Sequence, residues 1–151
     1  MKMYIDLSGQ IQQINLDSSL GFWREDGLNK AVFLKKSTKK EIIKKYKGQV
    51  TNLIEKLHCI MIYFCILDYL KDVNELEICK DVNFRRIKNL LPLLFKERDF
   101  LHNIKISQRK SNTKKSFGHR IALKIFRKKK YADKKITKEM IEYVLFKFKK
   151  E

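Results

Sequence analysis

The sequence has few residues of the kinds that break a chain or staple it together. In 151 residues there are one proline and five glycines, and we find neither an internal repeat nor a low-complexity linker. This length suits one domain with a hydrophobic core of its own. We therefore predict a single domain over residues 1–151, in which residues 129–151 form a C-terminal helical extension.

Cysteines are also few, and their spacing argues against two classes of protein. Cys59, Cys65 and Cys79 are odd in number and contain no C-x-x-C pair. A disulfide framework would need an even set, and a zinc site would need closely spaced ligands. We predict reduced thiols in the core of a cytoplasmic protein.

The sequence lacks an apolar run long enough to cross a membrane. The longest one, residues 57–70, is interrupted by His58 and Asp68, whereas a transmembrane helix needs about 20 apolar residues. The N-terminal residues do not show the charged and then apolar pattern of a secretion signal. We expect no membrane partner.

Acidic residues are scarce relative to basic ones. The chain has 17 Asp and Glu against 35 Lys and Arg, which gives a formal net charge of +18. Such an excess favours a polyanionic partner, and nucleic acid is the first candidate. Membrane surfaces and acidic proteins are weaker alternatives, and the lysine-rich composition could partly reflect the host organism or thermophily.

The basic residues are concentrated late in the chain. Residues 103–132 contain eleven Lys or Arg and no acid. Any one of these side chains could belong to a solvated charged face, but a run of this length predicts contacts with phosphates, which position a nucleic acid without specifying its sequence. The predicted phosphate-contacting residues are Arg85, Arg86, Lys88, Arg109, Lys110, Lys114, Lys115, Arg120 and Lys124.

The first part of the chain has the composition of strands and turns. Asp26-Gly27 is a dipeptide typical of tight hairpins, so the strands on either side of it are expected to be antiparallel. Phe22 and Trp23 beside this hairpin could stack on bases, although packing in the core is the simpler explanation. The predicted strands span residues 3–7, 20–24 and 30–35.

The middle of the chain changes to helical periodicity. One helix runs from Ser37, with Ser37 or Thr38 as its N-cap, to Gly48, and a second extends over residues 50–70. The second helix is apolar on most sides, which is typical of a buried helix packed across a sheet. His58 in this helix is interpreted as a core histidine.

A strand at residues 76–79 then leads into another helix. Beyond Asp81 apolar residues recur at the three and four spacing of one helix face. Pro92 predicts a kink or an early end there, because proline removes a backbone donor. The remaining predictions are a strand at 104–106, a helix at 117–126 and a helix at 136–148 capped by Thr137.

The predicted order of elements is β-β-β-α-β-α-β-α with a further C-terminal helix. Three antiparallel strands followed by helix-linked strands form a mixed sheet with helices on both faces. The predicted fold class is therefore α/β. In open sheets of this class, ligands bind in the crevice outside the strand ends.

Two aspartates lie where this pattern does not require them. Asp6 is inside the first strand, where aspartate is disfavoured, so it either faces water on an edge strand or binds a metal. Asp81 stands where a strand ends and a helix begins. Either this residue or Asn83 caps the helix, or Asp81 belongs to a ligand site.

Four segments resemble the ribonuclease H-like superfamily, over roughly residues 1–128. MYIDLSGQ resembles its first strand, NLIEKLHCIMI its first helix, ELEICKDVNFRRIKNLL its fourth strand with the following helix, and KSFGHRIALKIFR its last helix. The resemblance implies a ribonuclease H-like sheet and nuclease activity. Matched residue by residue, it implies that Asp6, Glu55, Asp81 and His119 are catalytic and bind metal.

Two of these matches have specific alternatives. Glu55 could be a solvated acid favoured by the helix dipole in a first turn, and Glu41 is an available substitute for it. His119 could be a surface residue of a lysine-rich segment. It stands where cellular ribonuclease H enzymes carry aspartate, although resolvase-like members carry histidine there.

The activity implied by the resemblance is phosphodiester hydrolysis with two divalent cations, Mg²⁺ or Mn²⁺, held largely by carboxylates. The basic residues would hold the substrate, either the RNA of an RNA–DNA hybrid or a branched DNA. Two alternatives remain open. One is a nucleic-acid-binding module of the same fold that has lost catalysis, and the other is a small basic component of a ribonucleoprotein.

Overall fold

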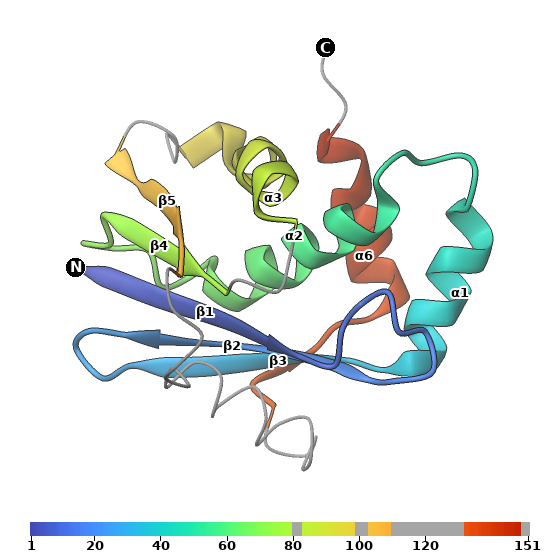
Figure 1. Ribbon diagram of the computed structural model, residues 1–151, viewed down its shortest axis with the longest axis horizontal. Helices are drawn as coiled ribbons and strands as arrows, with labels where there is room; N and C mark the ends of the chain where they lie inside the picture. The colour runs from blue at the N-terminus through green and yellow to red at the C-terminus, as the bar shows by residue number, and fades with distance from the viewer. Residues whose placement is uncertain (80–82, 99–102, 110–131, 149–151) are drawn as a thin grey trace.

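The computed structural model describes residues 1–79, 83–98, 103–109 and 132–148 (Figure 1). The strands among them form one mixed sheet in the order β5-β4-β1-β2-β3-β6. This arrangement confirms the predicted α/β class. The strands are β1 (Lys2–Ser8), β2 (Ser18–Arg24), β3 (Asn29–Leu34), β4 (Glu75–Ile78), β5 (Lys105–Gln108) and β6 (Lys134–Lys135).

The described helices lie together on one face of the sheet (Figure 1). The helix predicted at 117–126 falls outside the described residues, so the prediction of helices on both faces is not tested by this arrangement. The helices are α1 (Lys36–Tyr46), α2 (Leu53–Ile66), α3 (Phe84–Leu90) and α6 (Lys138–Leu145), with 3-10 segments η1 (Leu91–Arg98) and η3 (Phe146–Phe148).

The antiparallel start of the sheet is confirmed. β1 pairs antiparallel with β2, and β2 pairs antiparallel with β3. Gly27 adopts a φ of +94° in the connecting turn, a conformation that glycine reaches without steric cost. β4 lies parallel to both β1 and β5, so β1 is a central strand.

The strand β6 was not predicted. It consists of Lys134 and Lys135, which pair in parallel with Val32 and Phe33 at the edge of β3. Two lysines carry no apolar alternation, which is the signal that marks a strand in sequence. Backbone pairing with the existing edge therefore defines this strand.

The helix α2 fills the core over the sheet. Leu57, Ile60 and Met61 are almost completely buried, and each such side chain contributes about 1.5–3 kcal/mol by leaving water. The helix begins at Leu53, later than predicted, because Asn52 adopts a left-handed φ of 53°. It ends at Ile66, before the predicted end.

Two predicted helix boundaries are confirmed. The helix α3 ends at Leu90, two residues before Pro92, and a 3-10 segment follows. The hydroxyl of Thr137 accepts a hydrogen bond from Met140 N at 3.2 Å and caps α6. Both outcomes follow from local chemistry, namely the donor that proline lacks and the acceptor that threonine supplies.

The predicted cap of α1 is wrong. The helix begins at Lys36, before Ser37 and Thr38, and its N-cap residue Lys35 makes no side-chain cap hydrogen bond. Instead, Lys36 N donates to Asp17 Oδ1 at 2.8 Å. An aspartate from the loop after β1 therefore supplies the acceptor that a local cap would have provided.

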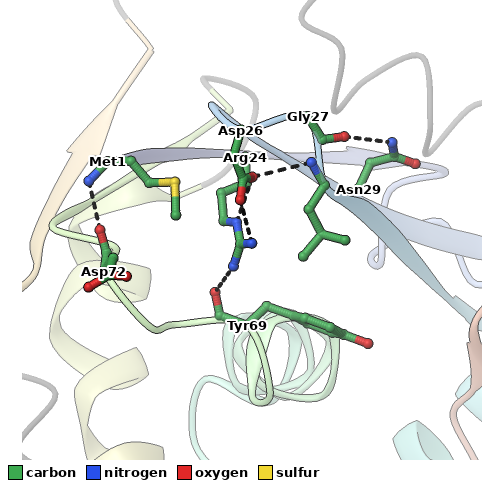
Figure 2. A network of polar contacts seen from close by, with 8 residues as sticks. Met1, Arg24, Asp26, Gly27, Asn29, Tyr69 and Asp72 are labelled. Carbon is green, nitrogen blue, oxygen red and sulfur yellow. Dashed lines mark hydrogen bonds and ion pairs between the residues drawn. The ribbon is translucent and has the colours of Figure 1, made fainter.

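Contacts at the end of the sheet where β1 begins hold the chain after α2 in place (Figure 2). The Arg24 guanidinium donates to Asp26 at 2.8 and 2.6 Å and to the Tyr69 carbonyl at 3.1 Å. The terminal ammonium of Met1 donates to the Asp72 carbonyl at 2.7 Å. The opposite end of β1, toward Ser8, carries the candidate site.

The three cysteines are buried thiols and form no disulfide, as predicted. Burial raises the pKa of the Cys59 and Cys65 thiols, which disfavours their reactive thiolate forms. In the described ranges, no helix has the length and apolar character needed to cross a membrane.

Candidate active site

Asp6 lies in the middle of the sheet. Its strand β1 runs between β2 and β4, and the residue is only 3% exposed. The hypothesis of a water-facing aspartate on an edge strand is therefore wrong. Because side chains alternate along a strand, Asp6 shares a face with Tyr4, whereas Met3 and Ile5 face the helices and the main core.

The Asp6 carboxylate is paired with an arginine from a distant part of the sequence. Arg109 follows β5, and its Nη2 lies 2.8 Å from Asp6 Oδ2. Arg109 N donates to the Ile78 carbonyl at 2.9 Å, which anchors the arginine at the end of β4. From there the Arg109 guanidinium extends to β1, so the buried carboxylate of Asp6 has a partner of opposite charge.

Glu55 stands in the first turn of α2, where the helix dipole favours a carboxylate. Its Oε1 lies 3.2 Å from Arg86 Nη1 on α3. Glu41, the alternative acid, lies elsewhere: it pairs with Lys138 at 3.0 Å and lines a different cavity beside α6.

A cavity of about 280 Å³ lies next to Glu55. It is bounded by the loop that follows β1 and by the first turns of α2 and α3, so it occupies the region outside the strand ends where α/β sheets bind ligands. The cavity is lined by Gln10, Ile11, Gln12, Ile54, Glu55, His58, Asn83 and Ile87.

His58 is the residue that sequence reasoning undervalued. It is buried, as predicted for a core histidine, but it also lines the cavity. Its Nε2 has no hydrogen-bond partner among the described residues. Burial lowers the pKa of His58 to about 4, although the charge of Asp6 opposes this shift. The available signal was the spacing of His58, three residues after Glu55 on one helix face.

A buried lysine holds the loop that forms one wall of the cavity. Lys39 Nζ donates to the carbonyls of Gln10 and Gln13 at 3.2 and 3.1 Å. Burial lowers the pKa of Lys39 to about 8, and the charge of Asp17 opposes this shift. The loop is therefore tied to α1 by an ammonium group that contacts two carbonyl oxygens.

The cap of α3 is now identified. Asn83 Oδ1 accepts a hydrogen bond from Arg86 N at 3.4 Å, so Asn83 supplies a side-chain cap to the first turn. The prediction for Asp81 itself lies outside the described residues, as does that for His119.

The predicted phosphate-contacting residues that the structure describes fall into two pairs. Arg85 and Lys88 are exposed on α3. Arg86 and Arg109 instead contact the carboxylates of Glu55 and Asp6. The other predicted contacts lie outside the described residues, and they are Lys110, Lys114, Lys115, Arg120 and Lys124.

The aromatic residues of β2 serve packing. Phe22 is fully buried in the core. The ring of Trp23 lies 5.6 Å from that of Tyr4, with a tilt of 37°, which is a favourable pair geometry. This arrangement agrees with the simpler of the two sequence interpretations.

The donors at the site suit a divalent cation in kind. The Glu55 carboxylate at the cavity matches Mg²⁺ or Mn²⁺, and the buried Nε2 of His58 lacks a partner within the described chain. Asp6 offers a carboxylate of the same kind, but it faces away from the helices and is not among the residues that line this cavity. In the described part of the chain, no group of three His, Cys, Asp or Glu side chains gathers into a ready-made metal site. A complete site would need a further donor.

Comparison with known proteins adds no assignment. No protein-family model matches this chain, and no curated protein and no solved structure matches it either.

Proposed function

We propose that this protein is a metal-dependent nuclease of ribonuclease H-like fold that hydrolyses phosphodiester bonds in a structured nucleic acid. The observation that carries the proposal is the buried Asp6 on the central strand β1, directly beside β4, the strand that leads to Asp81. A buried aspartate in a strand interior is disfavoured and needs compensating partners, of which Arg109 is one. A structural ion pair, however, does not require an aspartate at this end of the sheet. Metal binding at the end of the sheet would account for its position.

The charge of the chain supports the substrate class. A net charge of +18 attracts polyanions, and Arg85 and Lys88 are exposed on α3, the helix that contributes Ile87 to the cavity lining. Contacts of this kind hold phosphates without selecting a sequence. The proposed substrate is the RNA of an RNA–DNA hybrid or a branched DNA.

In the proposed reaction Asp6 and Glu55 would hold the cations, and the resemblance adds Asp81 and His119, which lie outside the described residues. Mg²⁺ or Mn²⁺ bound there would activate a water and neutralise the leaving oxygen. Arg109 and Arg86 contact the two carboxylates and orient them. Asp6 Oδ1 also accepts a hydrogen bond from Leu7 N at 3.0 Å, so a cation at Asp6 would share a carboxylate oxygen with these donors.

A second candidate follows from those same ion pairs. Arginines neutralise Asp6 and Glu55, and an ion pair of this kind could replace a metal ion permanently. The protein would then be a nucleic-acid-binding module of the same fold without catalysis. This candidate predicts binding without cleavage.

The experiment compares cleavage of an RNA–DNA hybrid, duplex DNA and a four-way junction in Mg²⁺ or Mn²⁺. We expect the wild-type chain to cleave at least one substrate and Asp6→Asn to lose about 100-fold or more of that rate, since even indirect disturbance of metal ligands costs 10–100-fold. Glu41→Gln is the matched control, because Glu41 lies at the other cavity. Binding without cleavage supports the second candidate. A protein that neither binds nor cleaves these nucleic acids refutes both candidates.

A further inference from the structure

The cavity outside β1 contains a pair of metal-binding side chain types on one helix. Glu55 and His58 are three residues apart on α2, and both line the cavity. Residues at this spacing are neighbours on a helix surface, so one cation can contact both. The sequence interpretation placed His58 in the core and gave it no role.

One ring nitrogen of His58 lacks a hydrogen-bond partner in the described chain. The residue is 4% exposed, and this nitrogen, Nε2, is buried. Buried polar groups are nearly always satisfied, so an exception at a cavity wall points to a missing ligand. An imidazole kept neutral by burial is also the form that binds a metal ion.

We propose that Glu55 and His58 together chelate one divalent transition-metal ion, of the class represented by Mn²⁺, in this cavity. The inference rests on the proposed function, because it assigns one of the two cation sites to named residues. The inference goes beyond the proposed function by adding His58 as a ligand and by stating which metal ion the site prefers. Glu55 contributes an oxygen and His58 contributes Nε2.

The choice of metal follows from the nitrogen donor. Mg²⁺ prefers oxygen ligands in strict octahedral geometry, whereas imidazole suits transition metals. The other polar groups of the cavity are the amides of Gln10, Gln12 and Asn83. Asn83 Oδ1 caps α3, whereas the amide oxygens of Gln10 and Gln12 can complete a mixed coordination shell. A phosphate oxygen of the substrate can supply a further ligand, since such sites commonly use substrate groups.

Glu55 has an oxygen for this role. Arg86 Nη1 donates to Oε1 of the carboxylate, so among the described side chains the ion pair engages Oε1 and not Oε2. The arginine side chain is 52% exposed, so it can move into solvent at little cost. A cation at Oε2 therefore does not require the helix to move.

The experiment is pulsed EPR of bound Mn²⁺, which detects coordination by an imidazole nitrogen. The chain has three histidines, so a His102→Gln, His119→Gln variant retains His58 as the single imidazole. We expect nitrogen coupling in this variant and its loss when His58→Gln is added. Absence of coupling in the double variant, or coupling that survives His58→Gln, overturns the inference.

Metal titrations provide a second readout that does not depend on the folding of one variant. Glu55→Gln, at a partly exposed position, is expected to weaken Mn²⁺ binding on the order of tenfold or more, and His58→Gln to do so for Mn²⁺ but not for Mg²⁺. Glu41→Gln is the control and should change neither the Mn²⁺ affinity nor the Mg²⁺ affinity. Equal Mn²⁺ affinity in wild type and Glu55→Gln overturns the inference.

These results separate the inference from the proposed function. Cleavage of a nucleic acid without nitrogen coupling overturns the inference and leaves the nuclease proposal in place. Nitrogen coupling that depends on His58, in a protein that cleaves none of the three substrates, supports the metal site and refutes the nuclease proposal.

Discussion

Replacing Lys39 with methionine should change how stability depends on pH. Lys39 is fully buried, and its ammonium contacts the carbonyls of Gln10 and Gln13 in the loop beside the candidate site. Methionine has nearly the same length and fills the same space, but it cannot take up a proton. The substitution therefore removes one titration from the folded state and leaves the rest of the chain unchanged.

The size of the effect follows from the pKa of Lys39. Burial lowers this pKa to about 8 from an ordinary value of 10.5. Between these two values the unfolded chain holds a proton that the folded chain has lost, so wild-type stability rises with pH in this window. A difference of about 2.5 pKa units corresponds to about 3 kcal/mol.

The assay is urea unfolding followed by circular dichroism at several values between pH 7 and 10.5. The free energy of unfolding of the wild type, minus that of Lys39→Met, should increase by about 3 kcal/mol across this range. Titration of other groups affects both proteins and cancels in the difference. Parallel pH profiles for the two proteins would refute the argument that burial holds the ammonium at a cost.

Three further predictions concern the contacts around the site. Arg109→Met should lower the free energy of unfolding by about 3–5 kcal/mol, because it leaves the buried Asp6 without this partner. A change below about 1 kcal/mol, measured by urea unfolding, would show that the Arg109–Asp6 pair does not behave as a buried ion pair. Charge reversal of the exposed residues Arg85 and Lys88 should weaken binding to all duplex sequences alike. It should also reduce the slope of log affinity against log salt by about 0.9 per lost phosphate contact. An unchanged slope, measured by fluorescence anisotropy, would remove α3 from the interface. Asn83→Ala should cost about 0.5–2 kcal/mol and Asn83→Asp almost nothing, and thermal melts in which both variants behave alike would contradict the assignment of Asn83 as the cap.

Local patterns predicted much of this fold. The Asp26-Gly27 hairpin, the helix end before Pro92 and the Thr137 cap depend on residues close together in sequence, and all three are present. The cap of α1 could not be predicted in this way, because its acceptor is Asp17, from the loop after β1. A local rule cannot identify a partner that the fold brings in.

The site was less predictable for the same reason. The low strand propensity of aspartate indicates that the position of Asp6 inside a strand needs an explanation. Whether that strand is central or at an edge depends on how β4 pairs with β1. The Arg109 partner is 103 residues away in sequence. His58 is predicted to be a core residue from its apolar surroundings. Its spacing from Glu55 indicates a shared helix face, but the cavity that both residues line is formed by segments distant in sequence.

The most direct test of the nuclease proposal is the cleavage rate of Asp81→Asn. Asn83 caps α3, and Asn replaces Asp without change of shape, so stability should barely change. If Asp81 binds the cation with Asp6, the loss of its charge should abolish Mg²⁺- or Mn²⁺-dependent cleavage, while nucleic-acid affinity persists or rises through reduced repulsion of phosphate. Cleavage of a wild-type substrate by Asp81→Asn at the wild-type rate would contradict the proposed site.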